Sequence, residues 1–316
     1  MSSPLTSSPV GFLGLGIMGK GMAARLISQG VAGTPARPLH VWNRTPAASE
    51  EFRAANPGAA VVIADSPRAL VAACCVTVSM LSTPEAAAEV FNAAEGTLAG
   101  VSAGTCIVDC ATLGEKDHKA MAEAVVEKGG RYLEAPVSGS KMPAAQGALV
   151  FLCGGDEKLF EEAAPELEAM GKASHFLGEV GMGTRAKLVV NSVMGTMLAT
   201  FSEGLQLTKA MGLDGNTMVT VFGQGACAAP MFALKGPKLC ADPPDHGTHF
   251  PLKHAHKDML LAREAAEELG VSFGINARAE ETFKRARDNG MGDLDFSAVY
   301  QDQIGEQDAK KQKTQE

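Results

Sequence analysis

Short apolar runs recur along the first 180 residues, separated by segments whose apolar positions follow helical spacing. The runs predict strands at 10–15, 39–42, 60–63, 76–81, 105–109, 132–135, 149–153 and 174–177. The segments between them predict helices at 20–28, 47–53, 84–91, 115–127 and 157–170. This alternation predicts an α/β fold of the Rossmann type, a doubly wound parallel sheet with helices on both faces.

The pattern changes at about residue 184. Residues 184–211 contain no proline, and a helix of that length would be on the order of 40 Å long. Its apolar residues cover more than one stripe, so we expect it to be buried on most sides. Those residues are Leu188, Val189, Val193, Met194, Met197, Leu198, Phe201 and Leu205. Further helices are expected at 217–222, 252–269 and 277–289.

The predicted organisation is therefore an α/β domain over 1–180 and an all-helical domain over 181–305, joined by the long helix. A polar tail follows at 306–316. The net charge of −8 argues against nucleic acid or an anionic membrane as a partner. The cysteines lie mostly in apolar runs, the N-terminus lacks a signal-peptide pattern, and no apolar run reaches the ~18 residues of a membrane span. We expect a cytoplasmic protein.

The first predicted strand leads into VGFLGLGIMG, which places Gly14, Gly16 and Gly19 at G-x-G-x-x-G spacing. In a nucleotide-binding turn, Gly14 would allow the bend, Gly16 the approach of a pyrophosphate, and Gly19 close helix–strand packing. The free N–H groups at the start of the following helix would then meet the phosphate charge. The alternative is a tight strand-to-helix turn that holds no ligand.

The end of the second strand, VWNRT, indicates which cofactor is bound. An NAD site places a carboxylate there, whereas this chain has Asn43, Arg44 and Thr45. A guanidinium attracts a 2′-phosphate and the neighbouring polar side chains can donate to it, so we predict NADP(H). The alternative is that Arg44 pairs with Glu50 or Glu51 on the next helix.

Candidate catalytic residues lie in the long helix, where Lys187 and Asn191 are four positions apart and share one face. A buried lysine is costly unless it has a task, and general acid catalysis is one. The alternative is a lysine that extends its ammonium to solvent from the start of the helix. Upstream, Ser138 and Gly139 could present a hydroxyl and backbone N–H groups to a small carboxylate, or could be an ordinary turn of small residues.

A metal site is not expected. The histidines at 246, 249, 254 and 256 do not fall at i, i+4 on one helical face, and no cysteine or carboxylate cluster completes a site around them.

Together these motifs resemble the β-hydroxyacid dehydrogenase family, whose members include 3-hydroxyisobutyrate dehydrogenases, and within it the glyoxylate/succinic semialdehyde reductase branch. The resemblance covers nearly the whole chain. It rests on GFLGLGIMG, VWNRT, EAPVSGSKMPAAQG, GMGTRAKLVVNSVMG, and FPLKHAHKDM together with GDLDFSAV. The pair Cys110–Ala111 departs from the family pattern, as does Arg185 within the lysine motif.

The resemblance implies a role for each matching residue. Lys187 and Asn191 would be catalytic. Ser138, Gly139, Phe250 and Asp258 would bind substrate. The residues expected to contact the cofactor are Gly14, Leu15, Gly16, Ile17, Met18, Gly19, Asn43, Arg44, Thr45, Leu81, Ser82, Thr112 and Lys257.

We therefore expect an NADPH-dependent reductase of short aldehyde acids such as glyoxylate or succinic semialdehyde. One alternative is a 3-hydroxyisobutyrate or related β-hydroxyacid dehydrogenase that uses NAD(P). Another is a non-catalytic NADP-binding regulatory protein. We also expect a homodimer or homotetramer.

Overall fold

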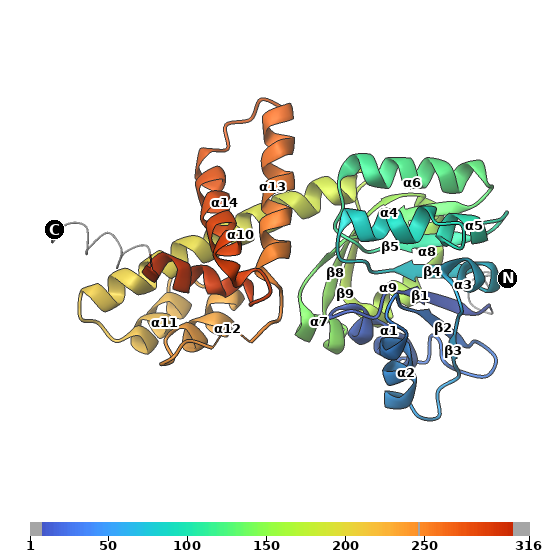
Figure 1. Cartoon of the computed structure of the whole chain (residues 1–316), viewed down its shortest axis with the longest axis horizontal. Coiled ribbons are helices and arrows are strands. Elements are labelled where there is room, and N and C mark those ends of the chain that lie inside the picture. Colours follow the sequence, from blue (N-terminus) through green and yellow to red (C-terminus); the bar gives the residue numbers. More distant parts are fainter. Residues whose placement is uncertain (1–7, 246, 306–316) are drawn as a thin grey trace. The chain divides into compact units, whose positions relative to one another are not determined.

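The computed structural model describes residues 8–245 and 247–305. It divides into two compact units, the first ending at Lys187 and the second beginning at Leu188 (Figure 1). The strands of the first unit are β1 (Val10–Leu13), β2 (Leu39–Trp42), β3 (Val61–Ile63), β4 (Val76–Ser79), β5 (Cys106–Asp109), β6 (Arg131–Glu134), β7 (Val137–Ser138), β8 (Leu149–Gly155) and β9 (Gly171–Phe176). Its helices are α1 (Gly19–Ser28), α2 (Pro46–Ala55), α3 (Pro67–Ala73), α4 (Pro84–Asn92), α5 (Thr97–Gly100), α6 (Glu115–Glu127), α7 (Lys141–Gln146), α8 (Glu157–Glu162) and α9 (Ala164–Met170).

The strands form one sheet in the order β3-β2-β1-β4-β5-β6-β8-β7, with β9 beside β8. All neighbours from β3 to β6 are parallel. The strand order reverses between β1 and β4, and ligands of open α/β sheets bind beyond the carboxyl ends of strands at such a reversal. A ligand is therefore expected at the residues that follow β1, β4 and β5.

Alternate residues of the central strands enter two different apolar clusters. Val10 and Phe12 of β1 pack in one cluster with Leu26 of α1, whereas Leu13 packs in the other with Leu70 of α3. Because successive side chains of a strand point to opposite faces, the sheet is covered by helices on both sides. The predicted Rossmann-type fold is confirmed.

The last strands differ from the prediction of a wholly parallel sheet. β8 is antiparallel to β6, and β7 is antiparallel to β8. Between β6 and β8 the only helix is α7, whose six residues span about 9 Å. Because that length cannot carry the chain back along the strand, β8 starts near the carboxyl edge and runs in the opposite direction.

Two local features of the first unit were also not predicted. The expected helix at 157–170 is divided into α8 and α9 at Ala163, two residues before Pro165. Proline removes a backbone donor and clashes with the preceding turn, so the helix restarts around it. The short helices α3 and α5 were not predicted because each spans at most two turns, too few for helical spacing of apolar residues to be recognised.

The second unit is helical. α10 (Met182–Ala210) starts in the first unit and continues into the second. It is followed by α11 (Gly215–Gln224), α12 (Pro230–Leu239), α13 (Leu252–Glu268), α14 (Gly274–Ala286), the kinked turn η2 (Arg287–Met291) and the 3-10 turn η3 (Phe296–Ala298). The core is built around Phe201 of α10, whose ring stacks on that of Phe232 of α12 at 4.2 Å between centroids. The predicted domain boundary at 180/181 lies just before α10, and the predicted tail at 306–316 lies outside the described residues.

The expectation that α10 is buried on most sides is wrong. Leu198, Phe201 and Leu205 are buried, whereas Val193 is half-exposed and Met197 more than a third exposed. Apolar residues therefore cover two stripes of α10, and within residues 8–245 and 247–305 one of them packs into the core. By length and composition alone α10 could cross a membrane, but a core helix of a soluble protein meets the same criterion.

Candidate active site

The glycine turn follows β1, and its three glycines are needed for different reasons. Gly14 has φ +94°, and a Cβ there would lie 2.4 Å from the Met80 carbonyl oxygen. A Cβ at Gly19 would lie 1.9 Å from the Gly14 carbonyl oxygen, so helix and turn pack too closely for any side chain. Gly16 is exposed, with nothing within 4 Å of its Cβ position. Its open backbone, beside the exposed side chain of Ile17, is where a ligand can approach.

The start of α1 suits an anion. Met18, its N-cap residue, makes no side-chain capping bond, and the first turn carries no acidic residue. The backbone N–H of Leu15 donates to Oδ1 of Asn43 at 3.0 Å, which ties the turn to the end of β2. Free N–H groups and the helix dipole favour a phosphate at this position. The residues present therefore fit the pyrophosphate of a dinucleotide.

Arg44 does not pair with either carboxylate considered from the sequence. Glu50 pairs with Arg53 at 2.5 Å and Glu51 with Lys20 at 2.8 Å. Arg44 instead lies 3.5 Å from Glu89 of α4. The next residue, Thr45, is exposed and makes no side-chain capping bond to α2. A guanidinium and a hydroxyl thus stand at the end of β2, where a ribose 2′-phosphate would lie.

The loops after β4 and β5 reach the same edge of the sheet. Leu81 follows β4, and its Cδ2 lies 3.1 Å from the Cβ position of Gly14, so this loop touches the glycine turn; the next residue, Ser82, is exposed. Thr112 follows β5 and is half-buried. The backbone of this loop is held by Asp109, whose Oδ1 accepts the N–H of Ala111 at 3.0 Å.

Ser138 is the last residue of β7, and Gly139 directly follows it. Ser138 pairs with Val150 of β8 and is half-buried, and Gly139 is exposed with φ +139°. A Cβ at Gly139 would lie 2.6 Å from Leu149 Cδ2. The glycine is thus required by both backbone conformation and space, and the sheet fixes the position of the serine hydroxyl.

Lys187 and Asn191 both lie on α10, one turn apart, and are buried at 5% and 3% exposure. The side-chain amide of Asn191 donates to Oδ2 of Asp258 on α13 at 2.6 Å. Oδ1 of the same carboxylate lies 2.8 Å from the ammonium of Lys257. The sequence-predicted residues Asn191, Asp258 and Lys257 therefore form one connected polar group within the second unit.

The segment before α13 is held by a buried carboxylate. Oδ2 of Asp295 accepts the backbone N–H groups of His249 and Phe250 at 2.9 and 3.2 Å. Oδ1 is 2.7 Å from the ammonium of Lys235, which is also buried. The Phe250 ring contacts that of Phe296 edge to face. Phe250 is thus fixed in backbone and side chain.

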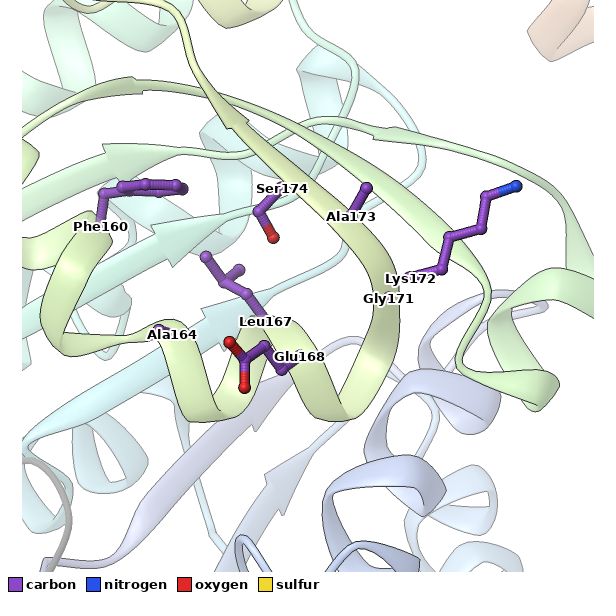
Figure 2. Close-up of a pocket in the computed structure, with 8 residues that line it drawn as sticks. All are labelled: Phe160, Ala164, Leu167, Glu168, Gly171, Lys172, Ala173 and Ser174. Atoms are coloured by element: carbon purple, nitrogen blue, oxygen red, sulfur yellow. The ribbon is translucent and has the colours of Figure 1, made fainter.

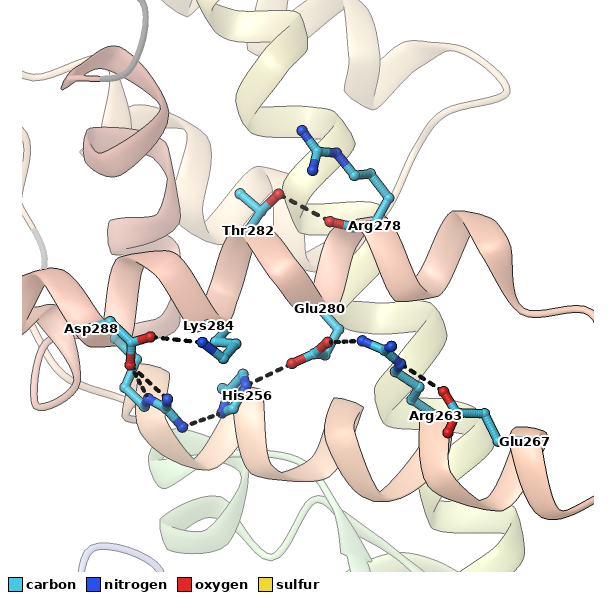
Figure 3. A network of polar contacts seen from close by, with 9 residues as sticks. His256, Arg263, Glu267, Arg278, Glu280, Thr282, Lys284 and Asp288 are labelled. Atoms are coloured by element: carbon cyan, nitrogen blue, oxygen red, sulfur yellow. Dashed lines mark hydrogen bonds and ion pairs between the residues drawn. The ribbon is translucent and has the colours of Figure 1, made fainter. Parts of the chain in front are cut away.

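A second polar network joins α13 to α14, with His256 at its centre (Figure 3). The guanidinium of Arg287 lies 3.2 Å from Nδ1 of His256. Because a guanidinium can only donate, Nδ1 accepts, and Nε2–H donates to Glu280 at 2.7 Å. Burial, followed by the charge of Arg287, lowers the pKa of His256 while Glu280 raises it. These two bonds tie α13, which carries Lys257 and Asp258, to α14 and η2.

Two buried carboxylates with many partners were missed at the sequence level, Glu134 and Asp295. Each lies inside a motif that carries the family resemblance, but nothing local marks its role because its partners are distant in sequence. The only available signal was a charged residue directly before or after an apolar segment.

Among the described residues, no group of three or more His, Cys, Asp or Glu is placed to hold a metal ion; His246 lies outside them. A surface hollow of about 340 Å³ lies between α8, α9 and β9, lined by Phe160, Leu167 and Ser174 among others (Figure 2). None of the predicted site residues lines it.

Sequence comparison divides the chain at the same helix. Residues 9–181 match the NAD-binding domain of 6-phosphogluconate dehydrogenase, and residues 181–302 match the NAD-binding domain of NADP-dependent 3-hydroxyisobutyrate dehydrogenase. Glyoxylate/succinic semialdehyde reductase 1 of Arabidopsis thaliana is 43% identical over 92% of this chain and 97% of its own. The chloroplastic reductase 2 of the same plant is 44% identical over 92% of this chain and 78% of its own.

A solved structure shares the fold over nearly the same length. The 3-hydroxyisobutyrate dehydrogenase of Mycobacterium tuberculosis superimposes with a TM-score of 0.78 at 27% identity, covering 93% of this chain and 98% of that one. The family models, the sequence relatives and the solved structure thus all match this chain over both units. The chain belongs to the 3-hydroxyisobutyrate dehydrogenase-like β-hydroxyacid dehydrogenase family of NAD(P)-binding oxidoreductases.

Proposed function

We propose that this protein is an NADPH-dependent reductase that converts short aldehyde acids, glyoxylate or succinic semialdehyde, to hydroxyacids. The observation that carries the proposal is a lysine almost fully buried one turn from Asn191, in a chain whose glycine turn fits a dinucleotide. The printed names of the two Arabidopsis relatives support the substrate class.

NADP(H) is proposed over NAD(H) because the end of β2 carries Arg44 and Thr45 and no carboxylate. A carboxylate there would repel a 2′-phosphate, whereas a guanidinium can bind it with charge-assisted hydrogen bonds. Asn43 contributes by holding the glycine turn through Leu15.

When bound, NADPH supplies a hydride to the aldehyde carbon of the substrate. The electron pair of the C=O bond moves to oxygen, and Lys187 donates a proton to that oxygen to give the hydroxyl. The neutral amine of Lys187 then regains a proton from solvent. Ser138 and the backbone at Gly139 bind the substrate carboxylate, which orients the carbonyl for attack. The family resemblance further implies that Asn191 orients the substrate, that Asp258 holds the geometry of the site, and that Phe250 and Lys257 contact substrate and cofactor.

A second candidate is oxidation of 3-hydroxyisobutyrate or a related β-hydroxyacid. It is supported by the match of residues 181–302 to a family described by that activity, and by the M. tuberculosis relative of that name. A non-catalytic NADP-binding protein is the third. It would bind cofactor tightly and turn over none of these substrates.

We further propose that the protein is a cytoplasmic homodimer or homotetramer that binds neither nucleic acid nor membrane. The unpacked apolar stripe of α10, with Val193 at 50% and Leu207 at 60% exposure, supports association of like chains. The negative net charge supports the absence of polyanionic partners.

The decisive experiment is loss of NADPH absorbance with glyoxylate and with succinic semialdehyde, repeated with NADH and, in the reverse direction, with 3-hydroxyisobutyrate. Faster turnover of an aldehyde acid with NADPH supports the proposal. Turnover restricted to hydroxyisobutyrate would favour the second candidate. Tight NADPH binding with no turnover would favour the third.

A further inference from the structure

Glu134, the last residue of β6, ends in a carboxylate that is completely buried and receives hydrogen bonds from the start of α10. Its Oε1 accepts the backbone N–H groups of Gly181 and Gly183, each at 2.7 Å, and a longer contact from the N–H of Thr184 at 3.4 Å. Its Oε2 accepts the hydroxyl of Thr184 at 2.9 Å. One side chain thus accepts three of the four N–H groups that a helix leaves unpaired in its first turn, and the fourth, that of Met182, donates to the Glu179 carbonyl.

The surrounding backbone makes room for this carboxylate. A Cβ at Gly154 would lie 2.5 Å from Glu134 Oε1, and a Cβ at Gly183 would lie 3.1 Å from the same atom. Gly181, which donates one of the hydrogen bonds, has φ +106°, a conformation that side chains other than glycine rarely adopt. Three glycines from two segments therefore allow the contact.

The partners also indicate the charge of the group. Three of the four partners are backbone N–H groups, which can only donate, and the Thr184 hydroxyl can donate the fourth bond, so an ionised carboxylate satisfies all of them. Burial raises the pKa of Glu134, and the four hydrogen bonds oppose that rise. A negative charge at the N-terminus of a 29-residue helix is also favoured by the helix dipole.

The position of Glu134 in the chain gives this contact a consequence for the reaction. Ser138 lies four residues after it, in β7, and Lys187 lies one turn after Thr184, in α10. We infer that Glu134 is a positioning residue that sets the distance between the carboxylate-binding turn at Ser138–Gly139 and the proton donor Lys187. The inference rests on the proposed function, because it takes the roles of those residues from it.

The primary test is Glu134→Gln, which keeps the shape and the acceptor oxygen but removes the charge and one acceptor. A displacement of about 1 Å between reacting groups can cost on the order of 10²-fold in rate. We expect kcat for the aldehyde acid to fall about 10- to 100-fold while the Kd for NADPH stays within about twofold. The kinetic isotope effect on kcat with NADPH deuterated at the transferred position should rise, since hydride transfer becomes slower than the other steps.

A matched pair of variants at Thr184 tests the same contact with a smaller change in structure. Thr184→Val removes the hydroxyl that binds Oε2 at nearly constant volume, and Thr184→Ser retains it. We expect Thr184→Val to reproduce part of the loss in kcat and Thr184→Ser to keep kcat close to that of the unmodified enzyme. If Glu134→Gln does not fold, this pair carries the test.

Glu166→Gln is the control for loss of a buried carboxylate. Glu166 lies on α9, is 1% exposed and pairs with Arg37, away from both Ser138 and Lys187 in sequence. It should lower the melting temperature yet leave kcat and the isotope effect unchanged at assay temperature. Equal losses of kcat in Glu134→Gln and Glu166→Gln, or a Glu134→Gln enzyme with kcat within twofold of the unmodified enzyme, overturn the inference.

Failure of the proposed function would be observed differently: the unmodified protein itself would not reduce aldehyde acids. Amide hydrogen exchange then tests the positioning without activity. Peptides covering residues 135–142 and 181–190 should exchange faster in Glu134→Gln, whereas peptides from the glycine turn should not. Unchanged exchange in both segments would overturn the inference independently of any substrate.

Discussion

Arg44, at the end of β2, lies 3.5 Å from Glu89 of α4, and both side chains are about two-thirds exposed, at 70% and 66%. The guanidinium proposed to bind the 2′-phosphate is therefore already near a carboxylate. Because two anions compete for one cation, Glu89 should weaken NADPH binding without affecting NADH. An exposed pair of this kind contributes about 0.2–1 kcal/mol, which limits the effect.

Glu89→Gln should lower the Kd for NADPH by up to about fivefold and leave the Kd for NADH unchanged. Arg44→Ala should raise the Kd for NADPH by about tenfold or more, again with little effect on NADH. Fluorescence titration of both cofactors, at low and at physiological salt, measures the ratio. Glu95→Gln is the control, because Glu95 pairs with Arg68 at 3.0 Å on the same unit.

The cofactor assignment and the role of Glu89 fail separately. An unchanged NADPH/NADH ratio in Arg44→Ala would show that the 2′-phosphate is bound elsewhere. A raised ratio of the NADPH Kd to the NADH Kd in Arg44→Ala, combined with no change in Glu89→Gln, would leave the assignment intact and remove the competition.

Lys187→Ala should abolish most turnover while cofactor binding survives. General acid catalysis contributes about 10²- to 10⁴-fold, so kcat should fall within that range. The Kd for NADPH should stay within about twofold, because the glycine turn and Arg44 are untouched. Steady-state kinetics with cofactor titration on the same preparation checks both. Turnover near that of the unmodified enzyme would remove Lys187 from the mechanism.

The hydrogen bond from Asn191 to Asp258 should be visible as an energetic coupling. Hydrogen bonds to charged groups contribute about 1.5–3 kcal/mol, and this one joins two buried side chains at 2.6 Å. A double-mutant cycle with Asn191→Ala and Asp258→Asn, followed by chemical denaturation and by kcat/KM, measures the coupling. We expect the double variant to be more stable than the sum of the two losses predicts. Additive losses would mean that the contact contributes little.

The sequence predicts an element or a contact when the residues that determine it lie close together along the chain. The glycine turn follows from three glycines within six positions, and their separate roles at Gly14, Gly16 and Gly19 agree with the space around each. Asn191 could be paired with Lys187 by helical spacing alone. Its actual partner, Asp258, is 67 positions away and no periodicity connects them.

The same limit explains the residues that were missed. Glu134 is 47 positions from Gly181, and Asp295 is 60 from Lys235. Each carboxylate stands beside an apolar strand or turn, where a single charged residue usually ends the element. Burial and partners become visible only after the chain has folded. The antiparallel entry of β8 was missed for a related reason, since strand direction depends on the length of the connecting helix and not on the strand's own pattern.

The buried pair between Lys235 and Asp295 should be a large contributor to the stability of the second unit. Removing one partner of a buried pair typically costs about 3–5 kcal/mol, because an uncompensated charge remains. Lys235→Met should therefore lower the free energy of unfolding by about that amount. Lys238→Met is the control on the same helix: Lys238 pairs with the exposed Asp245 at 3.1 Å and should cost less than about 1 kcal/mol. Similar losses in urea denaturation would contradict this ranking.

Asp109 should give the stability a pH dependence opposite to that of most carboxylates. It is buried, and burial raises its pKa from 3.8 to about 7, helped by the charge of Glu134 and opposed by hydrogen bonds from the Ala111 N–H and the Tyr132 hydroxyl. The Tyr132 hydroxyl in turn lies 2.7 Å from Nδ1 of the buried His118. Between about pH 4 and 7 the folded chain therefore retains a proton that the unfolded chain has lost.

It follows that the stabilising contribution of this proton is complete below pH 4 and is lost as the pH rises through 7. Asp109→Asn cannot ionise, yet its side-chain carbonyl can still accept the Ala111 N–H. The difference in melting temperature between the unmodified protein and Asp109→Asn should thus change steadily between about pH 4 and 7 and level off above pH 7, with the variant relatively more stable at the higher pH. Taking the difference cancels the other titrating groups. A constant difference across that range would mean that Asp109 is ionised in the folded protein throughout, and that its hydrogen bonds outweigh its burial.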